Sequence, residues 1–172
     1  MHLAGVVAEL EAQRVCAGVV CDANFVEAAM QAGIGAVIYA PLGGMSGLGE
    51  GPVQAPFEVL ALGTGRFIGT GPFYLGCHMD LGAMARVRCG GPHGIEIVVS
   101  SRKQQAADQA MFRHVGADPA DYRVLVLKSS VHFRADFAEL AEQILVVAAL
   151  GINVADLHQL RYEKLRPGVT LL

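Results

Sequence analysis

The stretch "IEIVVSSRKQQAADQAMFRHVGADPADYRVLVLK", residues 95–128, predicts much of the fold. It begins with an apolar strand and ends with another, "RVLVLK", whose unbroken apolarity is typical of a strand covered on both faces. Between them Ala107, Met111 and Val115 recur at four-residue spacing, as one face of a helix requires. Gly116 then ends the predicted helix. This order predicts a parallel β-α-β unit with a right-handed crossover.

A second unit of this kind is predicted near the beginning of the chain. The apolar segment "VCAGVV" at 15–20 indicates a strand, and Asp22 is placed to cap a following helix, "ANFVEAAMQAG". Gly33 is placed to end that helix, and "IGAVIYA" at 34–40 indicates the next strand. These two strands are also expected to be parallel, because a helix connects them.

Glycine turns separate short apolar segments in the middle of the chain, which predicts antiparallel hairpins. These segments are 53–62, 66–71, 83–89 and 94–101. The glycine-rich loop at 41–52 lacks the order of a dinucleotide fingerprint and is interpreted as a flexible turn. The fold class is therefore α/β: one domain over residues 1–172, with a mixed sheet, parallel β-α-β units at both ends and antiparallel hairpins between them.

The residues after 128 predict a helix, because apolar side chains recur there on one face. These are Phe133, Phe137, Leu140, Ala141 and Ile144. The segment "ILVVAALG", 144–151, is a candidate for one more strand, and the tail "RYEKLRPGVTLL" is expected to be irregular.

Composition argues against two classes of function. The net charge is −3 with no basic stripe, so nucleic acid is not expected as a partner. No apolar run reaches the roughly 18 residues that a membrane span needs, and "MHLAGVVAELEAQRV" does not resemble a signal peptide. No two of the four cysteines form a C-x-x-C pair, which favours reduced thiols and a cytoplasmic location.

Two segments, "IVVSSRKQQ" and "LVLKSSVHFR", share one pattern: a buried strand, a serine pair with basic residues, and a predicted helix. Parallel strands would bring both junctions to the same edge of the sheet, where ligands of open α/β sheets usually bind. Hydroxyl groups, cations and helix N-termini together favour an anion. The candidate substrate-binding or anion-binding residues are Ser101, Arg102, Lys128, Ser130, His132 and Arg134.

The alternative is structural, because serine is a preferred helix cap and the basic residues would then simply be solvated. No carboxylate is spaced to orient His132, so no catalytic residue is assigned. The cluster "CHMD" at 77–80 is interpreted as a chance grouping, because adjacent residues of a strand point to opposite faces and only two of the four could face one ion. No metal ligand is assigned in this chain.

The segments "VVSSRKQQAADQAMFRHVG" and "DPADYRVLVLKSSVHFRADFAELAEQILVVAALG", with the closing "LRPG", resemble the C-terminal domain of the MlrC-like metallopeptidases. This is the microcystinase C family, which is linked to the degradation of linearised microcystin. The likeness also includes "EVLALGTGRF", "GPFYLG" and "DLG".

The resemblance implies a larger zinc-dependent hydrolase. The family's zinc ligands, an aspartate and two histidines, belong to an N-terminal domain that is expected to be absent from this chain. The resemblance therefore implies an accessory or substrate-facing domain that is inactive by itself. Its partner would be that N-terminal domain or, because 53% of residues are hydrophobic and only 17% charged, further copies of the chain. A free-standing anion-binding module and an oligomerisation domain are the alternatives.

Overall fold

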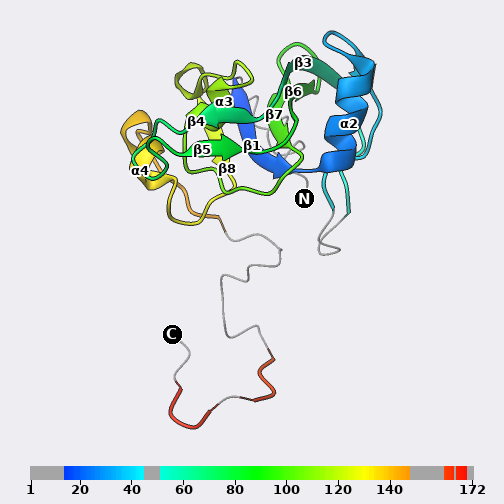
Figure 1. The fold of residues 1–172 in the computed structure, drawn as a ribbon. Helices are drawn as coiled ribbons and strands as arrows, with labels where there is room; N and C mark the ends of the chain where they lie inside the picture. Colours follow the sequence, from blue (N-terminus) through cyan, green and yellow to red (C-terminus); the bar gives the residue numbers. More distant parts are fainter. Residues whose placement is uncertain (1–13, 45–50, 148–160, 165, 170–172) are drawn as a thin grey trace.

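The computed structural model describes residues 14–44, 51–147, 161–164 and 166–169, and Figure 1 shows their arrangement. The α-helices α3 and α4 are only four residues long, so the described residues are built mainly from strands. The elements in chain order are β1 (Val15–Cys21), α2 (Ala23–Ala32), β2 (Val37–Ile38), β3 (Phe57–Gly63), β4 (Arg66–Ile68), β5 (His78–Asp80), β6 (Met84–Cys89), β7 (Ile95–Ser100), α3 (Ala110–Arg113), the 3-10 turn η1 (Pro119–Asp121), β8 (Val124–Leu127), α4 (Arg134–Phe137) and the 3-10 turn η2 (Ala138–Leu140).

Six of the strands form one sheet in the order β2-β3-β6-β7-β1-β8, and β4 and β5 form a separate antiparallel pair. β1 is parallel to both of its neighbours, β7 and β8. The other three pairs, β2 with β3, β3 with β6 and β6 with β7, are antiparallel. The predicted fold class, a single α/β domain with a mixed sheet, is confirmed.

Helix α2 forms because its amino end is capped and one of its faces is apolar. Asp22 accepts a hydrogen bond from the amide of Phe25 at 3.0 Å, as the sequence predicted for this cap. Phe25, Val26 and Ala29 are buried and pack on apolar side chains of β3, β6 and β7. The ring of Phe25 meets that of Phe57 edge to face, with centroids 5.1 Å apart. This packing covers one face of the sheet.

The other face of the sheet is covered at one end by α3, α4 and the β4–β5 pair. Phe112 and Phe137 pack edge to face with centroids 5.8 Å apart, and both are buried. They contact buried side chains of the sheet, including Cys16 and Val98, and Met79 of β5. In Figure 1, α4 lies at the opposite end of the molecule from α2. Short elements and loops therefore supply this second layer.

The expected orientation of β2 was wrong. Three antiparallel pairs separate β2 from β7, which is parallel to β1, so β2 runs antiparallel to β1. The chain after β2 turns back through the loop at 41–52 and pairs with β3, with an antiparallel bridge between Leu42 and Val53. The central part of this loop, 45–50, lies outside the described residues. β2 therefore pairs with β3, the next strand along the chain, and does not lie parallel to β1 as predicted.

The helix predicted after Ser100 was also wrong over most of its length. Residues 101–109 are not helical, because their amides bond elsewhere: Ser101 N donates to Ala83 O at 2.9 Å and Arg102 N to Leu81 O at 2.9 Å. Helical structure is confined to α3 and the turn that Gly116 ends with a φ of 73°. The apolar spacing correctly identified buried side chains, since Ala107, Met111 and Val115 are all in the core, but not the backbone that carries them.

Two predictions for the last third also need correction. β8 is the edge strand of the sheet rather than a strand covered on both faces, and Val124 is 42% exposed. The long helix predicted after residue 128 is limited to α4 and η2, and residues 141–147 contain no strand. Residues 148–151 of the candidate strand lie outside the described part, as do residues 1–13. No helix in the described ranges is long and apolar enough to cross a membrane.

Candidate functional site

The two serine junctions lie at the same edge of the sheet, as the sequence predicted. β7 and β8 flank β1 and both run parallel to it, so all three carboxyl ends point the same way. Ser100 at the end of β7 is level with Cys21, and Leu127 at the end of β8 is level with Gly18. The loops that leave these strands therefore start from neighbouring positions.

Direct contacts join the two junction loops. The amide of Ala106 donates to the carbonyl of Lys128 at 3.3 Å. The side-chain amide of Gln105 donates to Nδ1 of His132 at 2.6 Å. Residues that are more than twenty positions apart in the sequence are thus brought together at one edge.

A third loop, between β4 and β5, completes this edge. The ring of Phe73 lies against that of His132, with centroids 4.3 Å apart and planes tilted by 37°. Next to it, the hydroxyl of Tyr74 accepts a hydrogen bond from the side-chain amide of Gln104 at 2.6 Å. We call the loops 69–76, 101–109 and 128–134 together the three-loop rim. Sequence reasoning identified two of its three loops and missed the one at 69–76.

Most of the predicted binding residues are accessible on this rim. Lys128, Ser130, His132 and Arg134 are exposed, and Ser101 is half-buried. The guanidinium of Arg134 stacks over the neighbouring Phe133 ring, 5.2 Å from its centroid. Gln105 and the ring of Phe73 hold the His132 imidazole in position.

Arg102 is exposed but is already paired. Its Nη1 lies 2.8 Å from Oδ2 of Asp80, and Nε of Arg66 lies 3.5 Å from the same oxygen. The amide of Gly82, which donates to Asp80 Oδ1 at 3.0 Å, is the main cause that lowers the pKa of this carboxyl group, and Arg102 adds to the effect. Two guanidinium groups thus surround a single carboxylate. Each keeps N–H donors that face solvent, since the side chains are 62% and 77% exposed.

Gly82 has to be glycine for this arrangement. Its φ is +63°, and a Cβ atom there would lie 2.1 Å from the Ser101 hydroxyl oxygen. The turn after β5 therefore approaches Ser101 more closely than any other residue would allow.

Two of the junction serines have structural hydrogen bonds, but neither caps a helix as the structural alternative assumed. Ser129 Oγ accepts a hydrogen bond from the amide of Phe133 at 3.3 Å, and the buried hydroxyl of Ser100 donates to the carbonyl of Arg102 at 2.8 Å. The expected contribution of helix N-termini to anion binding was wrong. No helix begins after Ser101, and α4 begins only at Arg134.

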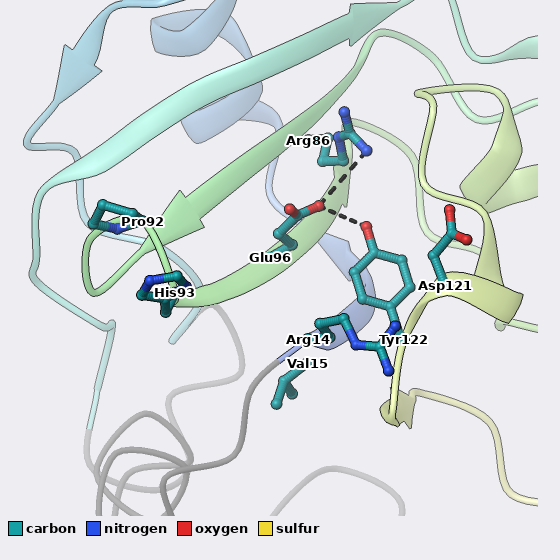
Figure 2. Close-up of a pocket in the computed structure, with 9 residues that line it drawn as sticks. Arg14, Val15, Arg86, Pro92, His93, Glu96, Asp121 and Tyr122 are labelled. Carbon is teal, nitrogen blue, oxygen red and sulfur yellow. Dashed lines mark hydrogen bonds and ion pairs between the residues drawn. The ribbon is translucent and has the colours of Figure 1, made fainter.

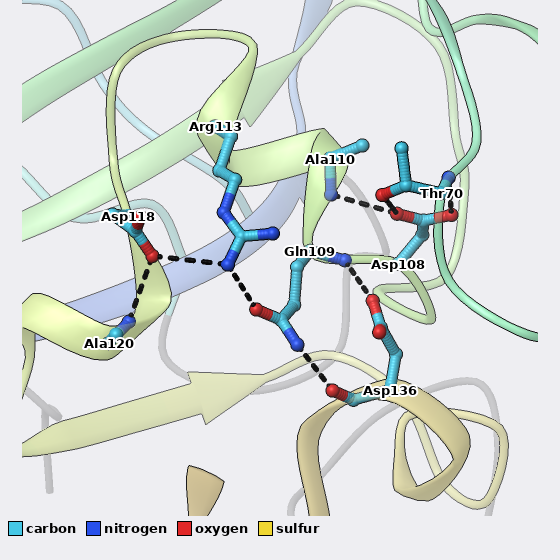
Figure 3. A network of polar contacts seen from close by, with 8 residues as sticks. All are labelled: Thr70, Asp108, Gln109, Ala110, Arg113, Asp118, Ala120 and Asp136. Atoms are coloured by element: carbon cyan, nitrogen blue, oxygen red, sulfur yellow. Dashed lines mark hydrogen bonds and ion pairs between the residues drawn. The ribbon is translucent and has the colours of Figure 1, made fainter.

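A fully buried carboxylate, Asp108, holds two of the rim loops together (Figure 3). Its Oδ2 accepts from the amides of Thr70 and Gly71, both at 2.9 Å, and its Oδ1 accepts from the amide of Ala110 at 2.8 Å. The hydroxyl of Thr70 donates to the same Oδ1 at 3.3 Å. One side chain thus fixes the loop at 69–76 to the beginning of α3.

A second carboxylate in Figure 3, Asp136 of α4, extends this network to the third loop. It accepts from the amide of Gln109 at 2.6 Å, and its carbonyl accepts from the Gln109 side chain. Gln109 also accepts from Arg113 at 2.8 Å, and Arg113 lies 3.4 Å from Asp118. Sequence reasoning missed Asp108 and Asp136. Asp108 lies next to Ala107 and near Met111 in a segment that was predicted to be a helix. Nothing in that pattern indicated that Asp108 or Asp136 would connect loops.

A hollow lies at the opposite edge of the sheet, where β1 and β7 begin (Figure 2). It has a volume of about 310 Å³, and none of the predicted binding residues lines it. Glu96 lies at its centre, where its Oε2 accepts from the Tyr122 hydroxyl at 2.6 Å and lies 3.6 Å from Nη1 of Arg86. Burial, with the negative charge of Glu96 adding to it, raises the pKa of the adjacent Cys16 thiol to about 12.

The donor set of the described residues does not fit a zinc ion. In these residues no three His, Cys, Asp or Glu side chains come together as a metal-binding group. His78 and Asp80 of the "CHMD" cluster do share the exposed face of β5, with Met79 buried between them, as the alternation predicted. The carboxylate of Asp80 is, however, taken by Arg66 and Arg102, which would repel a cation.

The fold and the rim define a single mixed α/β domain in which polar loops from three parts of the chain gather at one edge of the sheet. The chain belongs to the MlrC C-terminus family, whose model matches residues 1–164.

Two known proteins are similar to this chain. Microcystinase C from Sphingomonas sp. is 31% identical over 134 residues, which cover 78% of this chain and 25% of that protein. A crystal structure described as "Putative metallopeptidase", from Mesorhizobium sp. BNC1, superposes with a TM-score of 0.71 at 26% identity and covers 81% of this chain and 28% of that chain. The chain thus spans about a quarter of the length of these relatives.

Proposed function

We propose that this chain is the substrate-facing domain of a zinc-dependent metallopeptidase of the microcystinase C type, and that it does not hydrolyse peptides by itself. Family membership and the similar structure described as a putative metallopeptidase support the metallopeptidase part of the proposal, and the similarity to Microcystinase C supports the type. The cytoplasm is the proposed location, and the four free cysteines are compatible with its reducing conditions.

The three-loop rim is the observation that carries the substrate-facing role. The exposed cations Lys128 and Arg134 belong to the same loop as His132, whose imidazole lies against the half-exposed ring of Phe73. A peptide offers matching chemistry, because it carries a carboxylate, amides and apolar side chains. Arg102 contributes the further N–H donors that its contact with Asp80 leaves free.

In this proposal the metal chemistry comes from an N-terminal domain such as the resemblance implies, and not from the described residues. The described residues hold no group that fits zinc, and the relatives are about four times as long as the matched region. The role of the rim is to bind and orient the peptide, which accelerates a reaction by positioning the substrate rather than by supplying the nucleophile.

The experiment measures binding and hydrolysis separately. The 172-residue chain, with and without added zinc, is mixed with an unstructured peptide that has a free carboxyl terminus. We expect no cleavage but measurable binding in calorimetry, and weaker binding when the peptide is amidated. Arg102→Ala and Lys128→Ala are expected to weaken binding about three- to tenfold each, because each removes one cation from a partly exposed site.

The matched control is Arg123→Ala, an exposed arginine that precedes β8 at the other edge of the sheet. It should leave peptide binding unchanged. Zinc-dependent cleavage by the chain alone, or equal binding by Arg102→Ala and Arg123→Ala, would contradict the proposal.

A further inference from the structure

A group of uncharged side chains lies in the three-loop rim, beside its exposed cations. The ring of Phe73 contacts both the imidazole of His132 and the ring of Tyr74, with centroids 4.3 Å and 4.6 Å away. Gln105 is hydrogen-bonded to His132, and Gln104 to Tyr74. Phe73 is 44% exposed and His132 is also exposed, so a ligand on the rim can reach them.

The contact between Gln105 and His132 determines which nitrogen of the neutral imidazole carries the proton. The side-chain Nε2 of Gln105 is a donor only, and it lies 2.6 Å from Nδ1 of His132. Nδ1 is therefore the acceptor, and the ring carries its proton on Nε2. The ring of Phe73, tilted by 37° against the imidazole, helps to fix its orientation. His132 thus presents an N–H donor on the side of the ring away from Gln105.

Gln105 contributes an acceptor to the same place. Its contact with the imidazole uses Nε2, and its Oε1 has no hydrogen-bond partner within the part of the chain that the structure describes. A carbonyl oxygen of this kind accepts up to two hydrogen bonds. Gln105 and His132 together therefore offer one acceptor and one donor to a ligand, and neither group is charged.

We propose that Gln105 and His132 bind the main chain of one residue of an extended peptide, in which Oε1 of Gln105 accepts from the peptide N–H and Nε2 of His132 donates to the peptide C=O. This inference rests on the proposed function and narrows it, because it names the part of the peptide that this pair recognises.

A neutral donor and acceptor fit a peptide main chain better than they fit a carboxylate. In an extended peptide the N–H and C=O of one residue point to the same side, as they do when two strands pair. A carboxylate offers only acceptors, so one of its oxygens would face Oε1 of Gln105 with no hydrogen between them. The carboxyl terminus of the peptide is instead left to the cations of the rim, Lys128 and Arg134.

Main-chain recognition has two consequences for the choice of peptide. Proline and N-methylated residues lack the N–H group, so they are excluded from the position that Gln105 binds. Side chains of an extended peptide alternate between its two faces, and the exposed ring of Phe73 offers an apolar surface to one of them. The expected ligand is thus an extended peptide with an apolar side chain and an unsubstituted main chain beside it.

The first test replaces single amides of a peptide by esters. The probe is a hexapeptide of alanine and one phenylalanine with a free carboxyl terminus, and each analogue has an oxygen in place of one N–H. Calorimetry with the unaltered chain should reveal a position at which the ester weakens binding about tenfold, because Oε1 of Gln105 loses its donor there.

A matched pair of variants assigns this effect to Gln105. In Gln105→Met the acceptor is gone, so the sensitive ester and its parent peptide should bind equally well. Gln31→Met is the control, because Gln31 is an exposed glutamine of α2 that bonds to Glu27 at 3.3 Å. It should keep the tenfold difference. Circular dichroism checks that both variants are folded.

Nitrogen-15 spectra of the imidazole test the proton position without any peptide. At about pH 8, where histidines are usually neutral, His132 of the unaltered chain should be protonated on Nε2 and not on Nδ1. Gln105→Glu should reverse this, because a carboxylate only accepts and therefore requires a proton on Nδ1.

Three results would overturn the inference while leaving the proposed function in place. They are a His132 ring with its proton on Nδ1 in the unaltered chain, ester analogues that all bind as tightly as the parent peptide, and an ester effect that persists in Gln105→Met. Absence of binding by every peptide would overturn the proposed function together with this inference.

Discussion

Replacing Asp108 by alanine is expected to loosen the three-loop rim and destabilise the domain by about 3 kcal/mol. The carboxylate is fully buried and accepts hydrogen bonds from the amides of Thr70, Gly71 and Ala110. An unpaired buried amide costs roughly 1–3 kcal/mol, and those of Thr70 and Ala110 are only partly buried, so the lower end of that range applies to them. About 1 kcal/mol for each of these two amides, with at least as much for the buried amide of Gly71, gives a loss of about 3 kcal/mol or more.

Asp108→Asn separates the hydrogen bonds from the volume of the side chain. If its oxygen replaces Oδ2, the amides of Thr70 and Gly71 keep their acceptor and only that of Ala110 loses one, so we expect a loss of about 1 kcal/mol. Asp118→Ala is the exposed control: this carboxylate caps η1 through the amide of Ala120 and is 47% exposed, so a loss of about 0.5–1 kcal/mol is expected.

The assay is urea unfolding followed by circular dichroism, with all variants at one protein concentration because association shifts apparent stability. Hydrogen exchange of the Thr70 and Gly71 amides gives a local measurement, and both should exchange faster in Asp108→Ala than in Asp108→Asn. A loss below about 0.5 kcal/mol for Asp108→Ala, or equal losses for the two Asp108 variants, would refute the reasoning.

Three further results are expected. Burial lowers the pKa of His114, so the unfolded chain binds the proton more tightly; stability should be full above about pH 6.5 and should fall as the solution is made more acidic, and His114→Gln should flatten this dependence in urea titrations. A thiol reagent should label the exposed Cys77 in the native protein and reach Cys16, which is 0% exposed and has a pKa of about 12, only after unfolding. Gly71→Ala should displace the loop at 69–76 from α4, because a Cβ atom at position 71 would lie 2.6 Å from the carboxylate of Asp136. Proteolysis within this loop should then be faster than in the unaltered chain.

Local patterns identified most strands and the core, because the pattern of apolar residues reflects burial directly. The strand at 15–20 and the cap at Asp22 were found in this way. The same patterns did not fix pairing: whether β2 joined β1 or β3 depended on hydrogen bonds across the loop at 41–52. A short strand carries little information about its direction. The orientation predicted for β2 was therefore wrong because the local sequence does not encode its pairing, and not because a motif was misinterpreted.

The rim shows the same division between local and long-range information. Serines and cations after two apolar strands predicted that residues 101–109 and 128–134 meet at one edge, although helices were expected in place of loops, and parallel pairing with β1 explains why they meet. The third loop joins them through Phe73 and Asp108, contacts that span more than 35 residues in each case. Nothing in the neighbouring sequence marks such contacts, and they appear only when the chain is folded.

The most direct test of a substrate-facing rim is a nuclear magnetic resonance titration of the chain with a short peptide that has a free carboxyl terminus. The account predicts backbone amide shifts concentrated in residues 69–76, 101–109 and 128–134, with the His132 imidazole shifting as well. Shifts centred instead on Glu96 and Tyr122 at the opposite edge, or no shifts at millimolar peptide, would contradict it.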